Sequence, residues 1–519
     1  MNGQLKGSQI NQGYFGLMAV SSMALGALFQ AVLGIGNFWL GFLAASLLIF
    51  VCGIVCYLTW RAAGSDKIVA WMMILAFMLR LMYGVFLAWG LPRFGYDEPP
   101  QQAGFVFFDP YRREESAWYL ANSDQPLTQA FSVTYPADQY GGLLALSAFI
   151  YRYISPDAYR PALISILAAG AMTLSIPFLI AAIRRRFASK VAILAGWILV
   201  LYPEGILLGS SQMREPFLIL LFSMLFWVSV HWLDGSRIKL ATVIFILSTG
   251  CLFLLSFRVA LPIIGMMGVW LWVMSLPKIK KAWIRFVGWL LLALGLIGGV
   301  WFVRGWFQAV IHWDTLQTVI RSGMIQFQLE KIPEWLSFPF VLIYGIFQPI
   351  LPAAIADPAP WIWRSLAILR GLGWYALMPM LAYAFIRVWK IKPSWLKRWM
   401  ILITMLIWVW IFIASGRAGG DQWDNPRYRT IFLPWMALAA SWAFLFAKRI
   451  KDHWLTRIFI VEGIFLAFVT EWYLSRYYPI IPRLDFWVMM GIIFILSLAV
   501  LISGWVWDRK HHANTIMNG

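Results

Sequence analysis

The chain has 519 residues, of which 61% are hydrophobic and 13% are charged. Soluble domains carry about 25% charged residues, so this composition excludes a soluble globular protein and predicts an integral membrane protein. The formal net charge of +19 does not indicate nucleic-acid binding, because the basic residues cluster in short loops between apolar runs, as the positive-inside rule expects.

Runs of about 20 apolar residues, the length that crosses a bilayer, recur along the chain. They predict an all-α integral membrane fold with about 14 transmembrane helices, within a range of roughly 11 to 15, and with juxtamembrane helices in the outer loops. The predicted spans are 14–34, 38–60, 68–91, 160–182, 190–208, 216–233, 240–256, 259–276, 286–303, 366–387, 398–415, 430–447, 457–474 and 486–505.

Lysine and arginine are distributed unevenly between the loops. Clusters such as 184–190, 278–285 and 387–398 all fall on one side when the N-terminus is cytoplasmic. We therefore expect both termini in the cytoplasm and the protein in the inner (plasma) membrane of a bacterium. The outer side then carries two long loops, about 92–158 and 304–364, and a short polar loop, 416–429.

Two apolar segments are not counted as spans. Residues 338–356 are long enough to cross, but counting them would place the basic loop 387–398 outside. They contain Pro339, Pro349 and Pro352, so we expect a re-entrant or surface-lying segment on the outer side. Residues 141–154 are too short to span, and the same interpretation applies to them.

The first outer loop contains the segment FFDPYRREESAWYLANS, in which Asp109 precedes residues with helical spacing. This pattern predicts a helix on the membrane surface that begins near Asp109. An acid at a helix start is stabilised by the helix dipole. Asp109 is therefore interpreted either as an N-cap or as a catalytic carboxylate.

Two further carboxylates, Glu204 and Glu215, flank the next outer turn, YPEGILLGSSQMREPF. Carboxylates at membrane depth are functional candidates; the alternative is that Glu215 simply pairs with Arg214. Arg258 stands at the outer turn between two apolar runs. It is interpreted either as a snorkelling arginine or as a ligand for an anion.

The short loop SGRAGGDQWDNPRYRT contains Arg417, Arg427 and Arg429 on the side where positive charge is disfavoured. Arginine forks bind phosphate oxygens through two parallel hydrogen bonds. One interpretation is that the loop binds a lipid-linked phosphate. The other is an internal network in which Asp421 and Asp424 pair with the arginines and fold the loop.

Taken in order, these features resemble the GT-C superfamily, the membrane glycosyltransferases that use polyprenyl-phosphate sugars, such as the protein mannosyltransferases and the aminoarabinose transferases. The span 68–91 is similar to the first core helix of that family, and FFDPYRREESAWYLANS to its aspartate motif. YRPALISILAAGAMTLSIPFLIAAIRRRF resembles the second core helix, and SSQMREPFLILLF the segment with the second outer acid. The resemblance covers about residues 68–260, and the loop 416–429 loosely.

The resemblance divides the chain into four parts: two extra helices (1–67), a catalytic core with the outer loop 92–158 (68–303), an outer loop with the re-entrant or surface helix (304–364), and C-terminal helices with the arginine-rich loop 416–429 (365–519). The extra helices depart from the family pattern. No large C-terminal outer domain is expected, which argues against the oligosaccharyltransferase branch.

The resemblance implies an inverting transfer from a polyprenyl-phosphate sugar to an acceptor hydroxyl of a glycan, lipid or protein, on the extracytoplasmic side. It implies that Asp109 is the general base and that Glu215 assists catalysis. Acceptor or metal support is assigned to Asp138 and Glu204, and donor-phosphate binding to Arg258, Arg417, Arg427 and Arg429. Some branches use a divalent cation such as Mg²⁺ or Mn²⁺ and others none; no ligand cluster in the sequence decides between them.

Two other classes of function remain open. An O-antigen polymerase or ligase is also polytopic with long outer loops, and His312 is the one histidine predicted on the outer side. A transporter or flippase is the second alternative, but such proteins tend to show repeats and broken helices near the midplane. No internal repeat is evident in this sequence.

Overall fold

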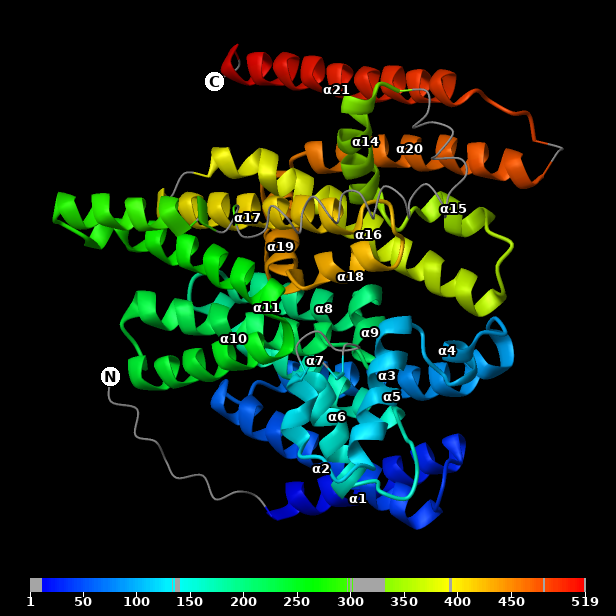
Figure 1. Cartoon of the computed structure of the whole chain (residues 1–519). Coiled ribbons are helices and arrows are strands. Elements are labelled where there is room, and N and C mark those ends of the chain that lie inside the picture. The colour runs from blue at the N-terminus through cyan, green and yellow to red at the C-terminus, as the bar shows by residue number, and fades with distance from the viewer. Residues whose placement is uncertain are drawn as a thin grey trace. The chain divides into compact units, whose positions relative to one another are not determined.

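The computed structural model describes residues 12–132, 134–135, 141–295, 297–298, 301, 332–391, 394–478 and 481–517. Every regular element in these ranges is a helix (Figure 1). The chain divides into two compact units, one formed by Met1–Arg186 with Gly196–Ile264 and the other by Phe187–Ala195 with Gly265–Gly519.

The first unit contains the N-terminal helices and the predicted first outer loop. Its helices are α1 (Gln12–Leu33), α2 (Phe38–Ala62), α3 (Lys67–Phe94), α4 (Pro99–Gln102), α5 (Phe108–Ala121), η1 (Leu127–Phe131), α6 (Gly142–Tyr153), α7 (Ala162–Arg184), α9 (Pro203–Gly209) and α10 (Glu215–Asp234). Two long helices, α8 (Ser189–Leu201) and α11 (Ile238–Ser275), each begin in one unit and end in the other.

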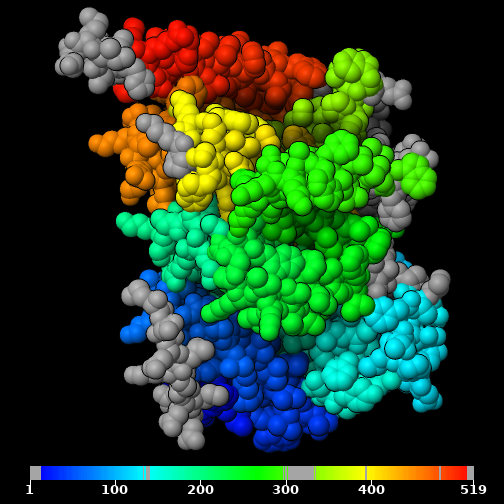
Figure 2. Space-filling model, turned by 90° about the vertical axis from the view of Figure 1, so that its left-hand side faces the viewer, coloured from blue at the N-terminus to red at the C-terminus, as the bar shows by residue number. Residues whose placement is uncertain are grey.

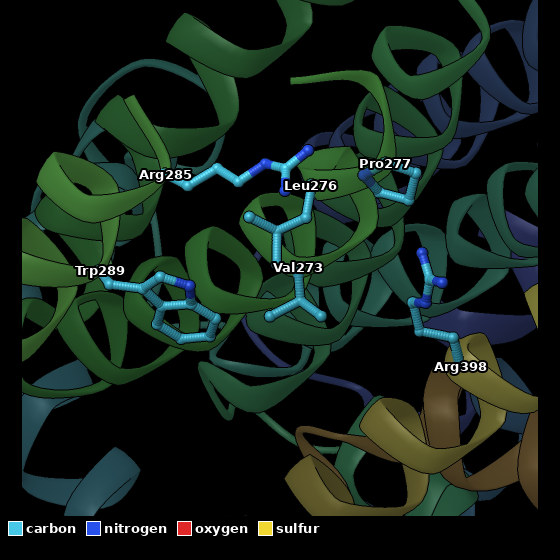
Figure 3. Close-up of a pocket in the computed structure, with 6 residues that line it drawn as sticks. All are labelled: Val273, Leu276, Pro277, Arg285, Trp289 and Arg398. Atoms are coloured by element: carbon cyan, nitrogen blue, oxygen red, sulfur yellow. The ribbon is translucent and has the colours of Figure 1, made fainter. Parts of the chain in front are cut away.

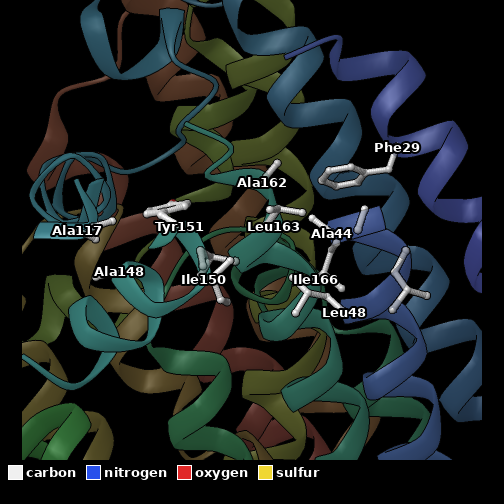
Figure 4. Packing of buried hydrophobic residues seen from close by; sticks show 14 of the residues in the cluster. Phe29, Ala44, Leu48, Ala117, Ala148, Ile150, Tyr151, Ala162, Leu163 and Ile166 are labelled. Carbon is white, nitrogen blue, oxygen red and sulfur yellow. The ribbon is translucent and has the colours of Figure 1, made fainter. Parts of the chain in front are cut away.

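An apolar cluster joins the loop helices to the transmembrane helices of this unit. Figure 4 shows α5 and α6 meeting at Ala117 and Tyr151, and α7 meeting α2 at Ile166 and Leu48. Small residues on the facing helices allow this close approach; at Gly170 of α7, for example, an added Cβ would lie 2.7 Å from the Cys52 sulfur. The predicted outer loop is therefore packed on these helices and shares one apolar core with them.

An ion pair fixes the end of the outer loop to the turn between α1 and α2. Arg160 is buried and donates to both carboxylate oxygens of Asp157, at 2.6 and 2.7 Å, and to the carbonyl oxygens of Ile35 and Asn37. The guanidinium lowers the pKa of Asp157 to about 2. Figures 1 and 2 both show the N-terminal helices (blue) beside the outer-loop helices (cyan).

The second unit contains the C-terminal helices. They are η2 (Leu276–Lys278), Ala282–Gly295, α14 (Glu334–Phe347), α15 (Leu351–Ala356), α16 (Trp361–Arg387), η3 (Val388–Lys390), α17 (Ser394–Ala418), α18 (Asp424–Thr430), α19 (Leu433–Ile450), α20 (Trp454–Tyr477) and α21 (Phe486–Met517). A membrane protein of this kind needs its backbone polar groups paired within helices, and the long apolar helices meet that need.

The described residues form 10 helices long and apolar enough to cross a membrane, or up to 12 if each of two bent pairs is one span. The prediction of about 14 spans is therefore not confirmed. The predicted span 190–208 is bent by 57° between α8 and α9, where Pro203 begins the second helix, and 430–447 belongs to the pair α18 and α19, which is bent by 75°.

The predicted segments at 240–276, 286–303 and 338–356 also differ from the helices that the structure describes. The predicted spans 240–256 and 259–276 form one element, α11, which is interrupted by non-helical backbone at Ser256. Residues 286–295 of the predicted span 286–303 belong to the helix Ala282–Gly295, and much of the rest of that span lies outside the described residues. Residues 338–356 form two short helices, α14 and α15, separated at Gln348–Ile350, and neither has the length of a span.

Candidate functional site

Helix α5 carries Asp109. Pro110, Arg113, Glu114, Ala117, Leu120 and Ala121 are its buried residues, and their spacing follows the helical period, so α5 lies with one face against the protein. The N-cap is Phe107, and Asp109 is the second helical residue, so the interpretation of Asp109 as the N-cap is wrong. Its side chain is exposed, and its negative charge lies in the first turn, where the helix dipole favours it.

The buried face of α5 holds an ion pair that the sequence reasoning missed. Arg113 donates to Glu114 from Nε and Nη2, at 3.1 and 2.8 Å. Glu114 also accepts from Ser147 at 3.0 Å and from Tyr151 at 2.6 Å, both on α6. Burial, and then the Glu114 charge, raise the pKa of Tyr151 well above its usual value, so the phenol keeps the proton that it donates. The helical period of the apolar residues on α5 would have placed both charged residues on the inner face.

The same arginine connects α5 to the turn that carries Glu215. Arg113 Nη2 donates to the carbonyl oxygen of Gln212, three residues before Glu215. Glu215 is fully buried in the first turn of α10, and its carboxylate lies 4.0 Å from Arg214 Nε. Glu204 is buried on α9, the short helix that precedes this turn. The buried Arg113 side chain thus joins α5, which carries Asp109, to the turn that precedes Glu215.

The outer loop also contacts the interruption in α11. At Gly142, the first residue of α6, an added Cβ would collide with the carbonyl oxygen of Leu254, two residues before the break at Ser256. Arg258 follows this break and its side chain is exposed. The sequence predicted a turn here, and the backbone break stands at that position.

In the second unit, the arginine-rich loop folds around its own acidic residues. Asp421 accepts from the backbone N–H groups of Trp423 and Asp424, at 2.7 and 2.8 Å, in the turn that precedes α18. Arg427 is buried and forms an ion pair with Asp424 at 3.1 Å, of the kind that an internal network requires. Arg417 is half-buried, with its guanidinium 4.0 Å from the centre of the Tyr428 ring.

Arg429, on α18, is fully buried, and its side chain contacts the end of α14. Its two terminal nitrogens donate to the carbonyl oxygens of Ile346, at 3.2 Å, and Gln348, at 2.7 Å. The loop approaches α14 again at Gly345, where an added Cβ would lie 2.6 Å from the carbonyl oxygen of Gly419. The position of the arginine-rich loop therefore depends on α14, which overlaps the segment 338–356 that we expected to be re-entrant or surface-lying.

A fourth arginine beside this loop was also missed. Arg370, on α16, is buried, and its guanidinium lies 4.3 Å from the centre of the Trp423 ring. A charged residue inside a predicted span, here 366–387, is itself a signal of a structural or functional role. Arg80 in the span 68–91 gives the same signal: it is buried and donates to the carbonyl oxygens of Leu199 and Val200.

Among the residues that the structure describes, no three of His, Cys, Asp and Glu gather closely enough to hold a metal ion. We therefore derive no step that uses a divalent cation. Asp138, expected to support the acceptor or a metal, and His312, the candidate for a ligase-type site, both lie outside the described residues. The candidate residues thus form two separate groups: Asp109, Glu215 and Arg258 belong to the first unit, and the arginine-rich loop belongs to the second.

No protein-family model matches this sequence, and no curated protein matches it.

Proposed function

We propose that this chain is a membrane glycosyltransferase of the GT-C type. It transfers a sugar from a polyprenyl-phosphate donor to an acceptor hydroxyl, on the extracytoplasmic side and with inversion. The observation that carries the proposal is the bond from Arg113 to the Gln212 carbonyl, which joins the helix of Asp109 to the turn of Glu215. An exposed acid and a buried acid are thereby held on neighbouring elements at the predicted membrane surface.

The exposed carboxylate suits the part of a general base. Asp109 accepts the proton of the acceptor hydroxyl, and the acceptor oxygen then attacks the anomeric carbon. The bond from that carbon to the phosphate oxygen breaks, and the polyprenyl phosphate leaves with the electron pair. Glu215, fully buried at the start of α10, assists by positioning the outer turn and does not contact the acceptor.

The leaving phosphate gains charge as its bond breaks, so cationic donors directed at it lower the barrier. Arg258 is exposed and Arg417 is half-buried, which makes both accessible to a ligand. Arg427 and Arg429 are buried in contacts with Asp424 and with α14. In this proposal Arg417 is the candidate phosphate ligand of the second unit and Arg258 that of the first, while Arg427 and Arg429 hold the loop that carries Arg417.

The test is the release of polyprenyl phosphate by purified protein in proteoliposomes. Donors are polyprenyl-phosphate hexoses and pentoses, each offered with glycan, lipid and protein acceptors. The wild type should release polyprenyl phosphate, and Asp109→Asn should lose about 10²-fold or more of the rate, the lower range for removing a general base. Asp124→Asn, an exposed acid just after α5, is the matched control and should keep the wild-type rate.

Two results would refute the proposal. One is that wild-type protein, shown to be folded by a cooperative thermal transition, consumes no donor with any acceptor. The other is an Asp109→Asn variant that works as fast as the control.

A further inference from the structure

The second unit contains a cavity of about 460 Å³ that the proposed reaction does not use. Its lining consists of Val273, Leu276, Pro277, Arg285, Trp289 and Arg398 (Figure 3). It lies at the turn between α11 and the helix Ala282–Gly295, which the distribution of basic residues predicts to be cytoplasmic. None of these six residues is acidic, so two cationic side chains share the cavity with an apolar wall.

Arg285, one of the two cationic residues of the cavity, is held in place by the turn itself. Arg285 donates from Nε and Nη2 to the carbonyl oxygen of Ile279, at 2.8 and 2.5 Å. The two arms of the hairpin are in close contact, because the Trp272 ring occupies the space that a Cβ at Gly288 would need. The guanidinium of Arg285 is therefore fixed at the mouth of a narrow hairpin.

Arg398, the second cationic residue of the cavity, comes from a different helix, α17. Arg398 is an exposed residue in the first turns of α17. Figure 3 shows its guanidinium and that of Arg285 extending from two sides toward Leu276 and Pro277. Two arginines from separate elements on one cavity can both donate charged hydrogen bonds to one anion.

The other lining residues identify the kind of anion. Val273 and Leu276 offer an apolar surface next to the charges, and Trp289 is exposed beside them, as is typical of rings at the headgroup level. A free inorganic anion would gain nothing from this wall, whereas acyl chains would. Basic pockets between helices on the cytoplasmic side bind the headgroups of anionic lipids. We propose that this cavity binds the phosphate of an anionic phospholipid of the inner leaflet.

The test is binding of phosphatidylglycerol to the purified full chain, counted by native mass spectrometry, with phosphatidylcholine as the neutral reference. The double variant Arg285→Gln/Arg398→Gln should raise the Kd for phosphatidylglycerol about tenfold or more, since a charged hydrogen bond is lost at each position. The control is Lys448→Gln/Arg449→Gln, which removes two charges from exposed residues on the same predicted side. It should bind as the wild type does.

Arg398→Gln alone leaves the Arg285 contact with Ile279 intact and should still weaken binding, so a folding defect in the double variant would not decide the result. Phosphatidylcholine binding as tight as that of phosphatidylglycerol would overturn the proposal. So would equal loss in the control and the double variant, or unchanged binding in both cavity variants. Displacement of the lipid by inorganic phosphate at equal concentration would show a site for a free anion and would also overturn it.

Discussion

The guanidinium of Arg429 lies 3.3 Å from the centre of the Trp374 ring, and both side chains donate to the carbonyl oxygen of Ile346. Tyr375 donates to the next carbonyl, that of Phe347, at 3.1 Å. The last carbonyls of a helix lack partners within the helix. Three side chains from two other helices therefore donate to the carbonyl oxygens at the end of α14. Arg429 is one of them, so its role is structural.

This arrangement predicts that Arg429→Ala destabilises the protein. The buried Gln348 carbonyl would lose the donor that Arg429 supplies, at a cost of about 1–3 kcal/mol for a group left unsatisfied, whereas the Ile346 carbonyl would keep Trp374. Thermal unfolding of the purified protein in detergent measures the change. Arg417→Ala, which removes a half-buried arginine of the same loop, is the control and should melt close to the wild type. If both variants melt alike, Arg429 does not stabilise the end of α14.

Arg417 should show the opposite behaviour in ligand binding. Arg417→Ala removes a charged donor that the proposed function directs at the phosphate, so the affinity for a non-hydrolysable polyprenyl-phosphate sugar should fall about tenfold or more. Arg417→Lys keeps the charge and loses the fork, and should give an intermediate affinity. Equal affinity in the wild type and Arg417→Ala would exclude this residue from the phosphate site.

The buried pair on α5 predicts a large effect from a small change. Glu114→Gln keeps the shape of the side chain but leaves the Arg113 charge buried without its partner; such changes cost about 3–5 kcal/mol. Activity should fall together with the unfolding temperature, because α5 carries Asp109. Glu115→Gln, the neighbour outside the buried face, is the matched control and should cost less than about 1 kcal/mol. Similar losses in the two variants would contradict the structural role of the pair.

The Asp157–Arg160 pair predicts a dependence of stability on pH. Because the folded-state pKa of Asp157 is about 2, below the ordinary value of 3.8, the pair stabilises the folded protein above about pH 4 and is lost as the pH falls toward 2. The shift corresponds to about 2 kcal/mol. Asp157→Asn should therefore melt below the wild type at pH 7, and the gap should narrow as the pH falls from about 4 to 2. A gap that stays constant would show that the carboxylate charge does not contribute.

The predicted orientation is tested by cysteine labelling in intact cells. In a background with Cys52, Cys56 and Cys251 replaced by serine, a membrane-impermeant maleimide should modify Asp124→Cys but not Lys239→Cys. Both positions are exposed, so accessibility within the protein does not limit the reaction. The reverse labelling pattern would invert the topology and place α5 in the cytoplasm.

The sequence was sufficient for the all-helical membrane fold, because long apolar runs leave few other solutions. It was less reliable where single residues decide the local geometry. Pro203 bends one predicted span, and the break at Ser256 separates two others within α11, so the count of about 14 is not confirmed by the described residues. The helix beginning near Asp109 is confirmed, but its N-cap is Phe107.

The partners of buried charges were beyond the reach of local patterns. Glu114 is satisfied by Ser147 and Tyr151 on another helix, and Arg429 by carbonyls of α14. These contacts join residues far apart in the sequence, which periodicity and composition do not relate. Helical spacing identified the face of α5, but only the tertiary structure shows what that face contacts.

Gly345 of α14 affects the position of every arginine of the short loop. Because the position that a Cβ would take at Gly345 lies 2.6 Å from the Gly419 carbonyl oxygen and 2.7 Å from the Asn425 side-chain nitrogen, the separation between α14 and the loop is set by a residue with no side chain. A methyl group added there would act as a wedge, displacing Arg417, Arg427 and Arg429 together while leaving all three chemically intact. The geometry of a cationic loop can thus be lost by adding one carbon atom to the helix opposite.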